Sequence, residues 1–125
     1  MYSHDYAFVY TPAMPSVELS IGLTGGRILA TLPAIVDSGA DVTLIPLRYL
    51  RQMCALPIER KQLRGIVGVA HLVQLYPIFV QIGEYGLYTR VVGSESNDEA
   101  ILGRDVLNQF IVTLNGLASM VEITQ

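Results

Sequence analysis

The chain has 125 residues, of which 51% are hydrophobic and 15% charged, a composition that favours a folded domain over a disordered segment. Its 8 basic and 11 acidic residues give a net charge of -3 without a basic run, which argues against nucleic acid as a partner. One cysteine and two histidines form neither an internal disulfide nor a set of metal ligands, so we expect no metal and no cofactor.

The sequence lacks the signals that direct a chain into or across a membrane. No apolar run approaches the ~20 residues needed to span a bilayer, and the first six residues have neither the basic start nor the apolar stretch of a signal peptide. We therefore expect a soluble chain in a reducing, cytoplasmic setting. A domain cut from a longer, membrane-anchored protein would look the same. A short chain that is this apolar is also expected to bury some of its apolar surface against a partner.

Strand signals dominate the first third of the chain. We interpret residues 1–13, which carry several aromatic side chains, as a flexible terminus, an edge strand or a propeptide-like segment. Apolar and polar residues alternate from Val17 to Leu23, which predicts a strand with one buried face, and the pair Gly25-Gly26 predicts a turn. Residues 27–36 predict a second strand, in which Pro33 marks a kink or an unpaired position because proline cannot donate to a ladder.

The middle of the chain predicts a short helix and a projecting hairpin. Residues 47–53 have the spacing of a helix. Two apolar arms flank the pair Gly65 and Gly68, and a long strand-like stretch follows at residues 72–82, so the two together predict a hairpin that projects. An ordinary hairpin turn is the alternative for the glycine pair.

The last third predicts more strands and a second helix. Residues 94–99 are the most polar stretch and predict a surface loop. A short buried strand at residues 100–103 leads into a helix at residues 104–110. Residues 111–123 form two strand-like runs around Asn115-Gly116, a strong hairpin signal. The sequence thus predicts one mainly β domain, residues 1–125, with mostly antiparallel strands and two short helices.

The chemistry of the chain centres on Asp37, which follows an apolar strand directly and opens the tripeptide Asp37-Ser38-Gly39. Gly39 permits a tight turn and a close approach of another chain, and the Ser38 hydroxyl can hold the loop through a hydrogen bond. Hydrolysis of a peptide bond by this route needs one carboxylate that takes a proton from water and another that delivers one. Two copies of Asp37 on a two-fold axis meet that need. Taken alone, this tripeptide is more often a surface turn.

Three elements in order carry a resemblance to the retropepsin-like aspartic proteases: residues 37–41, the glycine-containing hairpin, and residues 100–105, which read Ala-Ile-Leu-Gly-Arg-Asp. The resemblance covers residues 15–123. It implies a retropepsin-like closed β-barrel, or sandwich half, with a flap hairpin. It also implies a homodimeric aspartic endopeptidase whose two Asp37 carboxylates share one proton, a known property of such enzymes, with activity at acidic to mildly acidic pH.

The resemblance also assigns roles to residues. Ser38 and Gly39 support Asp37, and Arg104 forms a structural ion pair with Asp41. The backbone amides of a flap centred on residues 65–68 would grip an extended polypeptide substrate. The substrate-binding residues that it implies are Gly39, Asp41, Leu44, Gly65, Ile66, Val67, Gly68 and Ile101. Because the pockets they line are apolar, we expect cleavage between hydrophobic residues.

Some features depart from the family or leave alternatives open. Ser38 stands where the family more often has threonine, and the hairpin at residues 111–123 is longer than the single short strand of retroviral enzymes. We expect Cys54 to be a small buried side chain and His71 to lie on a strand surface. An inactive dimerisation or peptide-binding module with the same fold, and an autoprocessing domain of a larger chain, are the alternatives to a free-standing endopeptidase.

Overall fold

The structure is a computed structural model that describes residues 1–64, 70–95 and 98–125. Within these residues the chain forms ten strands and two short helices. Their order is β1 (Tyr2–Asp5), β2 (Ser16–Gly22), β3 (Ile28–Val36), β4 (Leu44–Pro46), α1 (Leu47–Gln52), β5 (Glu59–Arg64), β6 (Ala70–Ile82), β7 (Tyr85–Ser94), β8 (Ala100–Leu102), α2 (Arg104–Leu107), β9 (Ile111–Asn115) and β10 (Met120–Thr124). The prediction of a mainly β fold is confirmed.

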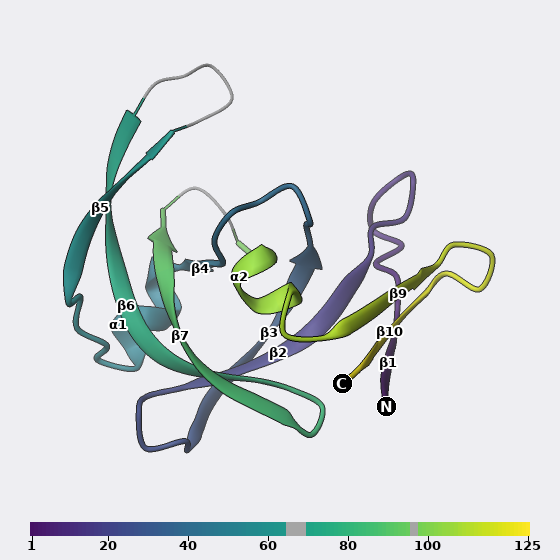
Figure 1. The fold of residues 1–125 in the computed structure, drawn as a ribbon, viewed down its shortest axis with the longest axis horizontal. Helices are drawn as coiled ribbons and strands as arrows, with labels where there is room; N and C mark the ends of the chain where they lie inside the picture. The colour runs from purple at the N-terminus through teal and green to yellow at the C-terminus, as the bar shows by residue number, and fades with distance from the viewer. Residues whose placement is uncertain (65–69, 96–97) are drawn as a thin grey trace.

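The strands divide into a closed barrel and a smaller sheet. Seven strands pair in the order β2-β3-β8-β4-β7-β6-β5, and β2 also pairs with β6, so that all of them except β5 form a ring. Strand β5 lies outside the ring and pairs with β6 from Glu59↔Leu75 to Arg64↔Ala70 as the predicted projecting hairpin. The other sheet has the order β1-β10-β9. In Figure 1 the β5–β6 and β9–β10 hairpins extend from opposite sides of the barrel.

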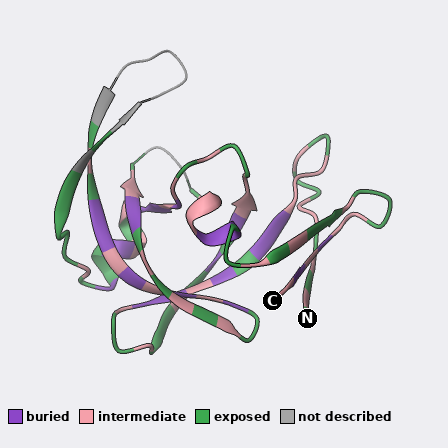
Figure 2. Cartoon of the chain, in the orientation of Figure 1, coloured by how far each residue is buried: buried purple, intermediate pink, exposed green. Residues whose placement is uncertain are grey.

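The barrel is closed around apolar side chains that alternate along its strands. On β2 the side chains of Val17, Leu19 and Ile21 are fully buried, as their spacing predicts. Figure 2 shows buried segments around the barrel and exposed segments along the two hairpins. The core also includes Leu32, Ala34, Ile45, Ile78, Val80, Ile82, Val91, Ala100 and Leu102. Burial of this apolar surface is the main stabilising contribution, about 25 cal/mol per Å², and it fixes the strand ends that carry the site.

The three-stranded sheet joins the two ends of the chain. Strand β1 pairs antiparallel with β10, from Tyr2↔Ile123 to Asp5↔Met120, so residues 2–5 form an edge strand. The Tyr2 ring packs against the core, and its hydroxyl accepts a hydrogen bond from the Glu18 backbone N–H at 3.0 Å. Burial raises the pKa of this tyrosine. Strand β1 thus links the sheet to β2 of the barrel, β10 lies at the centre of the sheet, and β9 forms its other edge.

Both helices are shorter than the sequence predicts, and neither helix of the described ranges is long and apolar enough to cross a membrane. Helix α1 ends one residue before its predicted end at residue 53, and α2 ends three residues before its predicted end at residue 110. After α2, the backbone N–H groups of Gln109 and Phe110 donate to the carbonyls of Val106 and Leu107, at 3.0 and 3.1 Å. These bonds span three residues, so the chain tightens into a turn before β9 begins.

The prediction that Cys54 is buried is wrong, because this residue is exposed. Cys54 follows α1 with φ at 59°, in the left-handed region. Its backbone N–H donates to the Arg51 carbonyl at 3.0 Å, and the N–H of Ala55 donates to the Leu50 carbonyl at 2.9 Å. These two bonds form a Schellman motif, which places the thiol at the position usually held by glycine and turns it away from the core.

The C-terminal hairpin is present, but its turn differs from the simple two-residue form. Asn115 is the last residue of β9 and pairs with Met120, so four residues make the loop. The Asn115 Oδ1 accepts a hydrogen bond from the Ala118 N–H at 3.0 Å, and the positive φ of 52° falls on Ser119. Asparagine therefore acts through its side chain, which bonds the N–H three residues on, and not through a left-handed backbone.

Candidate functional site

Asp37 lies immediately beyond the end of β3. Strand β3 pairs in parallel with β8, with Ala34 opposite Ala100 and Val36 opposite Leu102. The Asp37 N–H donates to the Leu102 carbonyl at 3.0 Å, which extends this ladder by one bond. The half-buried carboxylate is thus positioned by a strand that comes from a distant part of the sequence.

The loop after Asp37 folds back onto its carboxylate. The Gly39 N–H donates to Asp37 Oδ1 at 2.9 Å, and the Ala40 N–H donates to the Asp37 carbonyl at 3.2 Å. The φ of Gly39 is not in the left-handed region, so the tight turn forms without the backbone conformation that favours glycine. A Cβ at this position would lie 3.2 Å from Asp37 Oδ1. A side chain at this position would therefore crowd the carboxylate, which would have to shift by a few tenths of an ångström.

Arg104 closes the loop from the opposite side. Its Nη1 donates to the Ser38 carbonyl at 2.7 Å, its Nη2 forms an ion pair with the Asp41 carboxylate, and its backbone N–H donates to the Ala40 carbonyl at 2.9 Å. The Ser38 side chain is exposed, and its hydroxyl makes no hydrogen bond within the part of the chain that the structure describes. Within one chain, Ser38 holds the loop through its backbone carbonyl and not through its hydroxyl, which the sequence predicts to bond.

A second polar cluster lies behind the loop, and sequence reasoning missed it. The fully buried Thr43 hydroxyl donates to Asp105 Oδ1 at 2.8 Å and accepts a hydrogen bond from the Gly103 N–H at 3.1 Å. The Asp105 carboxylate also accepts the backbone N–H groups of Thr43, at 3.1 Å, and Val106, at 2.9 Å. A Cβ on Gly103 would lie 2.5 Å from the Val42 backbone. The available signals were a threonine inside an apolar run and an acidic residue in the first turn of α2.

Two of the predicted pocket residues are neighbours. Leu44 of β4 pairs with Ile101 of β8, and Ile101 also lies opposite Ile35 of β3. Ala100 and Leu102 are fully buried, so the half-buried Ile101 points to the other face of its strand. These apolar side chains lie beside the strand end that carries Asp37.

The structure brings several of the predicted site residues into one region and leaves others undescribed. Asp37, Ser38, Gly39, Asp41, Leu44, Ile101 and Arg104 gather at the adjoining ends of β3, β4, β8 and α2. Gly65, Ile66, Val67 and Gly68, the predicted flap tip, lie outside the described residues. The two strands that lead to this tip are paired along their length.

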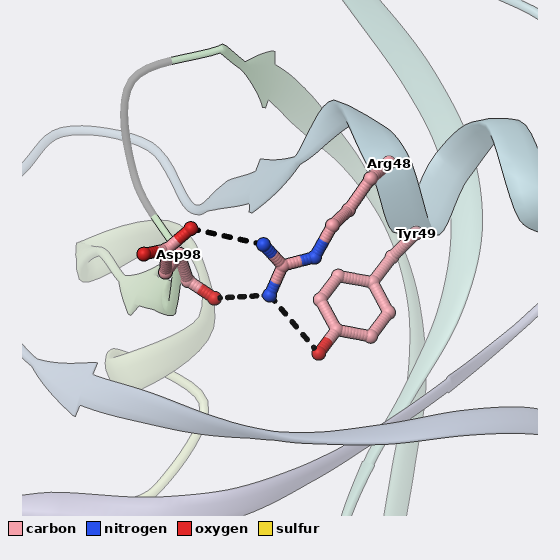
Figure 3. A network of polar contacts seen from close by, with 3 residues as sticks. All are labelled: Arg48, Tyr49 and Asp98. Carbon is pink, nitrogen blue, oxygen red and sulfur yellow. Dashed lines mark hydrogen bonds and ion pairs between the residues drawn. The ribbon is translucent and has the colours of Figure 1, made fainter.

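Helix α1 is tied to the loop that leads into β8 (Figure 3). Arg48 Nη1 donates to Asp98 Oδ1 at 2.9 Å, and Nη2 donates to the Asp98 carbonyl at 3.1 Å and to the Tyr49 hydroxyl at 3.5 Å. The guanidinium also lies 4.9 Å from the centre of the Tyr49 ring. The hydrogen bond to Tyr49 and then that to Asp98 raise the pKa of Arg48. Exposed ion pairs contribute little to stability, so this contact connects α1 to the segment before β8 at little gain in stability.

The chemistry open to a single chain is limited. Within residues 1–64, 70–95 and 98–125, no group of three or more histidine, cysteine, aspartate or glutamate residues could hold a metal ion. Asp41 is engaged by Arg104, and Asp105 by Thr43. Asp37 is left as a positioned carboxylate that accepts a hydrogen bond from Gly39. Such a group can act as a general base toward water.

Comparison with known proteins agrees with this geometry. The sequence model of the family described as "Retroviral aspartyl protease" matches residues 11–115. The solution structure of simian foamy virus (mac) protease has a TM-score of 0.56 and 22% identity, over 74% of this chain and 91% of that chain. A retropepsin-like aspartic protease from Rickettsia conorii has a TM-score of 0.63 and 12% identity, over 95% of this chain and 87% of that chain. The retroviral protease-like domain of Ddi1 from Leishmania major has a TM-score of 0.56 and 18% identity, over 90% of this chain and 89% of that chain. A search of curated protein sequences gave no match.

Proposed function

The chain belongs to the retroviral aspartyl protease family, and we propose that it is an aspartic endopeptidase that is active as a homodimer. The observation that carries the proposal is the fixed position of Asp37. Its backbone continues the β3–β8 ladder through Leu102, and its carboxylate accepts the Gly39 N–H at 2.9 Å. A carboxylate held by its own loop and by a neighbouring strand is pre-organised, as a catalytic group must be.

The reaction needs a second carboxylate, and the described residues of a single chain place no free one beside Asp37. One carboxylate takes a proton from the attacking water while another, protonated, delivers a proton to the carbonyl oxygen of the substrate. The nearby candidates are already engaged, because Asp41 pairs with Arg104 and Asp105 is bound by Thr43. A second copy of Asp37, related by a two-fold axis, supplies the missing group. Two such carboxylates close together do not both ionise readily, so the pair keeps one proton at acidic to mildly acidic pH.

The substrate we propose is an extended polypeptide that is cut between hydrophobic residues. The support for this preference is the apolar pair Leu44 and Ile101, which lies beside the strand end that carries Asp37. We also propose that the exposed Asp41 and the Gly39 backbone contact the main chain of the substrate. The predicted flap tip, residues 65–68, would cover the peptide by strand addition and exclude water.

A non-catalytic module with the same fold is the rival function. It would keep the barrel and the dimer, and it would bind peptides without cutting them. The position of Asp37 favours catalysis, because a purely structural dimer gains nothing from two carboxylates that face one another at an electrostatic cost.

A cleavage assay separates the two functions. Wild-type protein and the Asp37→Asn variant are incubated with a mixed peptide library between about pH 4 and pH 7, with and without pepstatin, and the products are identified by mass spectrometry. We expect pepstatin-sensitive cleavage by the wild type and a loss of at least about 100-fold in the variant. Asp5→Asn, which changes an exposed carboxylate on β1, is the matched control and should cleave normally. A wild type that binds peptides and cuts none, or an Asp37→Asn variant that cuts equally well, contradicts the proposal.

A further inference from the structure

The hairpin of β5 and β6 is basic in a chain that is acidic as a whole. From Arg60 to the end of β6 the sequence has three basic residues, Arg60, Lys61 and Arg64, and no acidic one, whereas the whole chain has a net charge of -3. Glu59, just before them, forms an ion pair with Arg90 of β7 at 3.3 Å. The exposed Arg60 forms no ion pair with any residue that the structure describes. The start of this hairpin therefore attracts negative charge.

Two depressions on and beside this hairpin share Gln74 in their linings. The first, of about 240 Å³, is lined by Pro57, Ile58, Glu59, Arg60 and Gln74. The second, of about 320 Å³, extends from Gln74 over Leu72, Val73 and Tyr76 of β6 to Leu47 and Gly93. Ile58 is 54% exposed and Leu72 is 62% exposed. We call the two depressions together the hairpin groove, which has apolar side chains along its length and Arg60 at one end.

The hairpin groove begins close to the apolar residues of the proposed active site. Leu44 pairs with Val92 of β7, Val92 pairs with Leu75 of β6, and Leu75 pairs with Glu59 of β5. This row crosses three spaces between strands, each about 4.8 Å wide, so it is about 14 Å long. An extended polypeptide rises about 3.3 Å per residue, so about four or five residues span this distance. One polypeptide can therefore lie beside Leu44 and also reach Arg60.

Gln74, at the junction of the two depressions, has hydrogen-bond donors to offer. Its Oε1 accepts a hydrogen bond from the Tyr76 hydroxyl at 3.2 Å. Its amide NH2 group donates to none of the residues that the structure describes, so it can donate to a carbonyl or carboxylate oxygen of a bound polypeptide. Glu95, which lines the groove as Glu59 does, lies 4.0 Å from Arg51 in an ion pair. Both acidic residues of the lining are thus partly neutralised.

We propose that the hairpin groove binds an acidic segment of the polypeptide substrate, about four or five residues away from the bond that is cut. This inference rests on the proposed function and adds a substrate class to it. The substrate has hydrophobic residues at the cleaved bond and, at that spacing, glutamate or aspartate next to an apolar residue. The apolar side chain contacts Leu72, and the carboxylate faces Arg60.

A polypeptide fits the hairpin groove better than other acidic or apolar occupants. Proteins that bind single-stranded nucleic acid commonly add exposed aromatic rings on which bases stack. Among the described lining residues the aromatic ring is that of Tyr76, which is 8% exposed. The exposed Ile58 and Leu72 instead offer apolar contacts to the side chains of a polypeptide. A second copy of the chain would bring the same basic hairpin, and like charges repel.

The first test measures binding apart from cleavage, with the Asp37→Asn variant, which retains the groove. Two fluorescent peptides carry a leucine pair and, about five residues beyond it, either two glutamates or two glutamines. Fluorescence anisotropy is recorded at about pH 6.5, where glutamate is ionised. At low ionic strength we expect the Kd of the glutamate peptide to be at least about tenfold lower, with a smaller difference in about 0.5 M salt. Equal Kd values for the two peptides overturn the proposal.

Variants of the groove identify the residues that read the acidic segment. Arg60→Glu should abolish the preference for glutamate, and Leu72→Ser should weaken the binding of both peptides. Arg27→Glu and Leu29→Ser, at exposed residues outside the groove, are the matched controls and should bind as the parent does. Circular dichroism verifies that every variant is folded. A peptide with two lysines in place of the glutamates should bind the Arg60→Glu variant more tightly than the parent. A preference that survives Arg60→Glu, or that Arg27→Glu removes equally, contradicts the proposal.

Cleavage by the protein with Asp37 intact separates this proposal from the proposed function. With the glutamate peptide, Arg60→Glu should raise KM at least about tenfold and leave kcat within about twofold, because the groove binds the substrate away from the reacting bond. If the wild type cuts no peptide but binds the glutamate peptide through Arg60, the proposed function fails and the groove stands. If it cuts both peptides equally well, the function stands and the groove fails. An oligothymidylate of equal charge that binds more tightly than the glutamate peptide would assign the groove to nucleic acid and overturn the proposal.

Discussion

Thr43 and Asp105 are joined by a hydrogen bond of 2.8 Å across 62 positions of the sequence. The threonine side chain is fully buried, and its hydroxyl also accepts the Gly103 N–H at 3.1 Å. One side chain therefore connects the segment after the Asp37 loop with the end of β8 and the start of α2. This connection lies directly behind the loop of Asp37.

Replacement of Thr43 by valine, which has nearly the same shape, tests this connection. Thr43→Val leaves the Asp105 carboxylate without one donor and the Gly103 N–H without an acceptor. An unsatisfied buried polar group destabilises a protein by about 1–3 kcal/mol, and we expect a loss of this size in urea unfolding. Thr31→Val, at an exposed threonine that bonds Ser20, is the control and should change stability by less than about 0.5 kcal/mol. Equal effects in the two variants would show that the buried bond contributes nothing special.

Gly39→Ala should impair catalysis far more than stability. The added methyl group would lie 3.2 Å from Asp37 Oδ1 and would push the carboxylate from its position. Small displacements of a catalytic group lower rates strongly, so we expect kcat/KM to fall by about 10- to 100-fold. Gly25→Ala, where nothing lies within 4 Å of the new methyl group, is the matched control. Peptide cleavage and thermal unfolding are measured together. Full activity in the Gly39→Ala variant would mean that the carboxylate is not confined by this glycine.

Arg104→Lys keeps the positive charge and removes the fork that reaches two partners. A lysine cannot bond the Ser38 carbonyl and the Asp41 carboxylate in the same geometry. The arginine side chain is 42% exposed, so the change in stability should stay below about 1 kcal/mol. Activity should fall at least several-fold, because the loop around Asp37 loses a fixed point. Arg90→Lys, which affects the exposed pair with Glu59, controls for loss of an arginine. If both variants retain full activity, backbone bonds alone hold the loop.

The exposure of Cys54 can be checked with a thiol reagent. Because the side chain follows α1 in a left-handed conformation and points outward, it should react in the native protein at a rate within about tenfold of that in urea. Cys54→Gly should be neutral or stabilising, since glycine adopts this backbone conformation without a steric penalty. Strong protection of the native thiol would contradict the structure at this position.

Local patterns in the sequence account for much of the fold. The alternation at Val17, Leu19 and Ile21 predicts the buried face of β2, and the Gly25-Gly26 pair predicts the turn that follows. These features are determined by residues that are close in the sequence, so a sequence pattern can predict them. The position of Asp37 at a strand end is of the same kind, because an apolar run before a turn is a local signal.

Contacts between distant segments could not be predicted in the same way. Nothing near Thr43 indicates that its hydroxyl bonds Asp105, because both residue types are common and the contact is tertiary. The pairing of β1 with β10, which joins the two ends of the chain, could not be predicted for the same reason. Cys54 was misplaced because hydrophobicity favours burial, whereas the Schellman motif at the end of α1 decides where the side chain points.

The parallel pairing of β3 with β8 has a consequence for the order of folding. The loop of Asp37 takes its shape from Leu102 and Arg104, and Arg104 lies 66 positions after the Ser38 carbonyl that it bonds. Contacts of this sequence separation form slowly, since the loss of chain entropy precedes the gain in contact energy. During synthesis, a chain that has not yet extended to α2 already contains Asp37 and Gly39 but lacks the bonds from Leu102 and Arg104 that hold the rest of the loop. The loop around Asp37 can therefore take its final shape only when the chain has been made as far as α2, which is most of the domain.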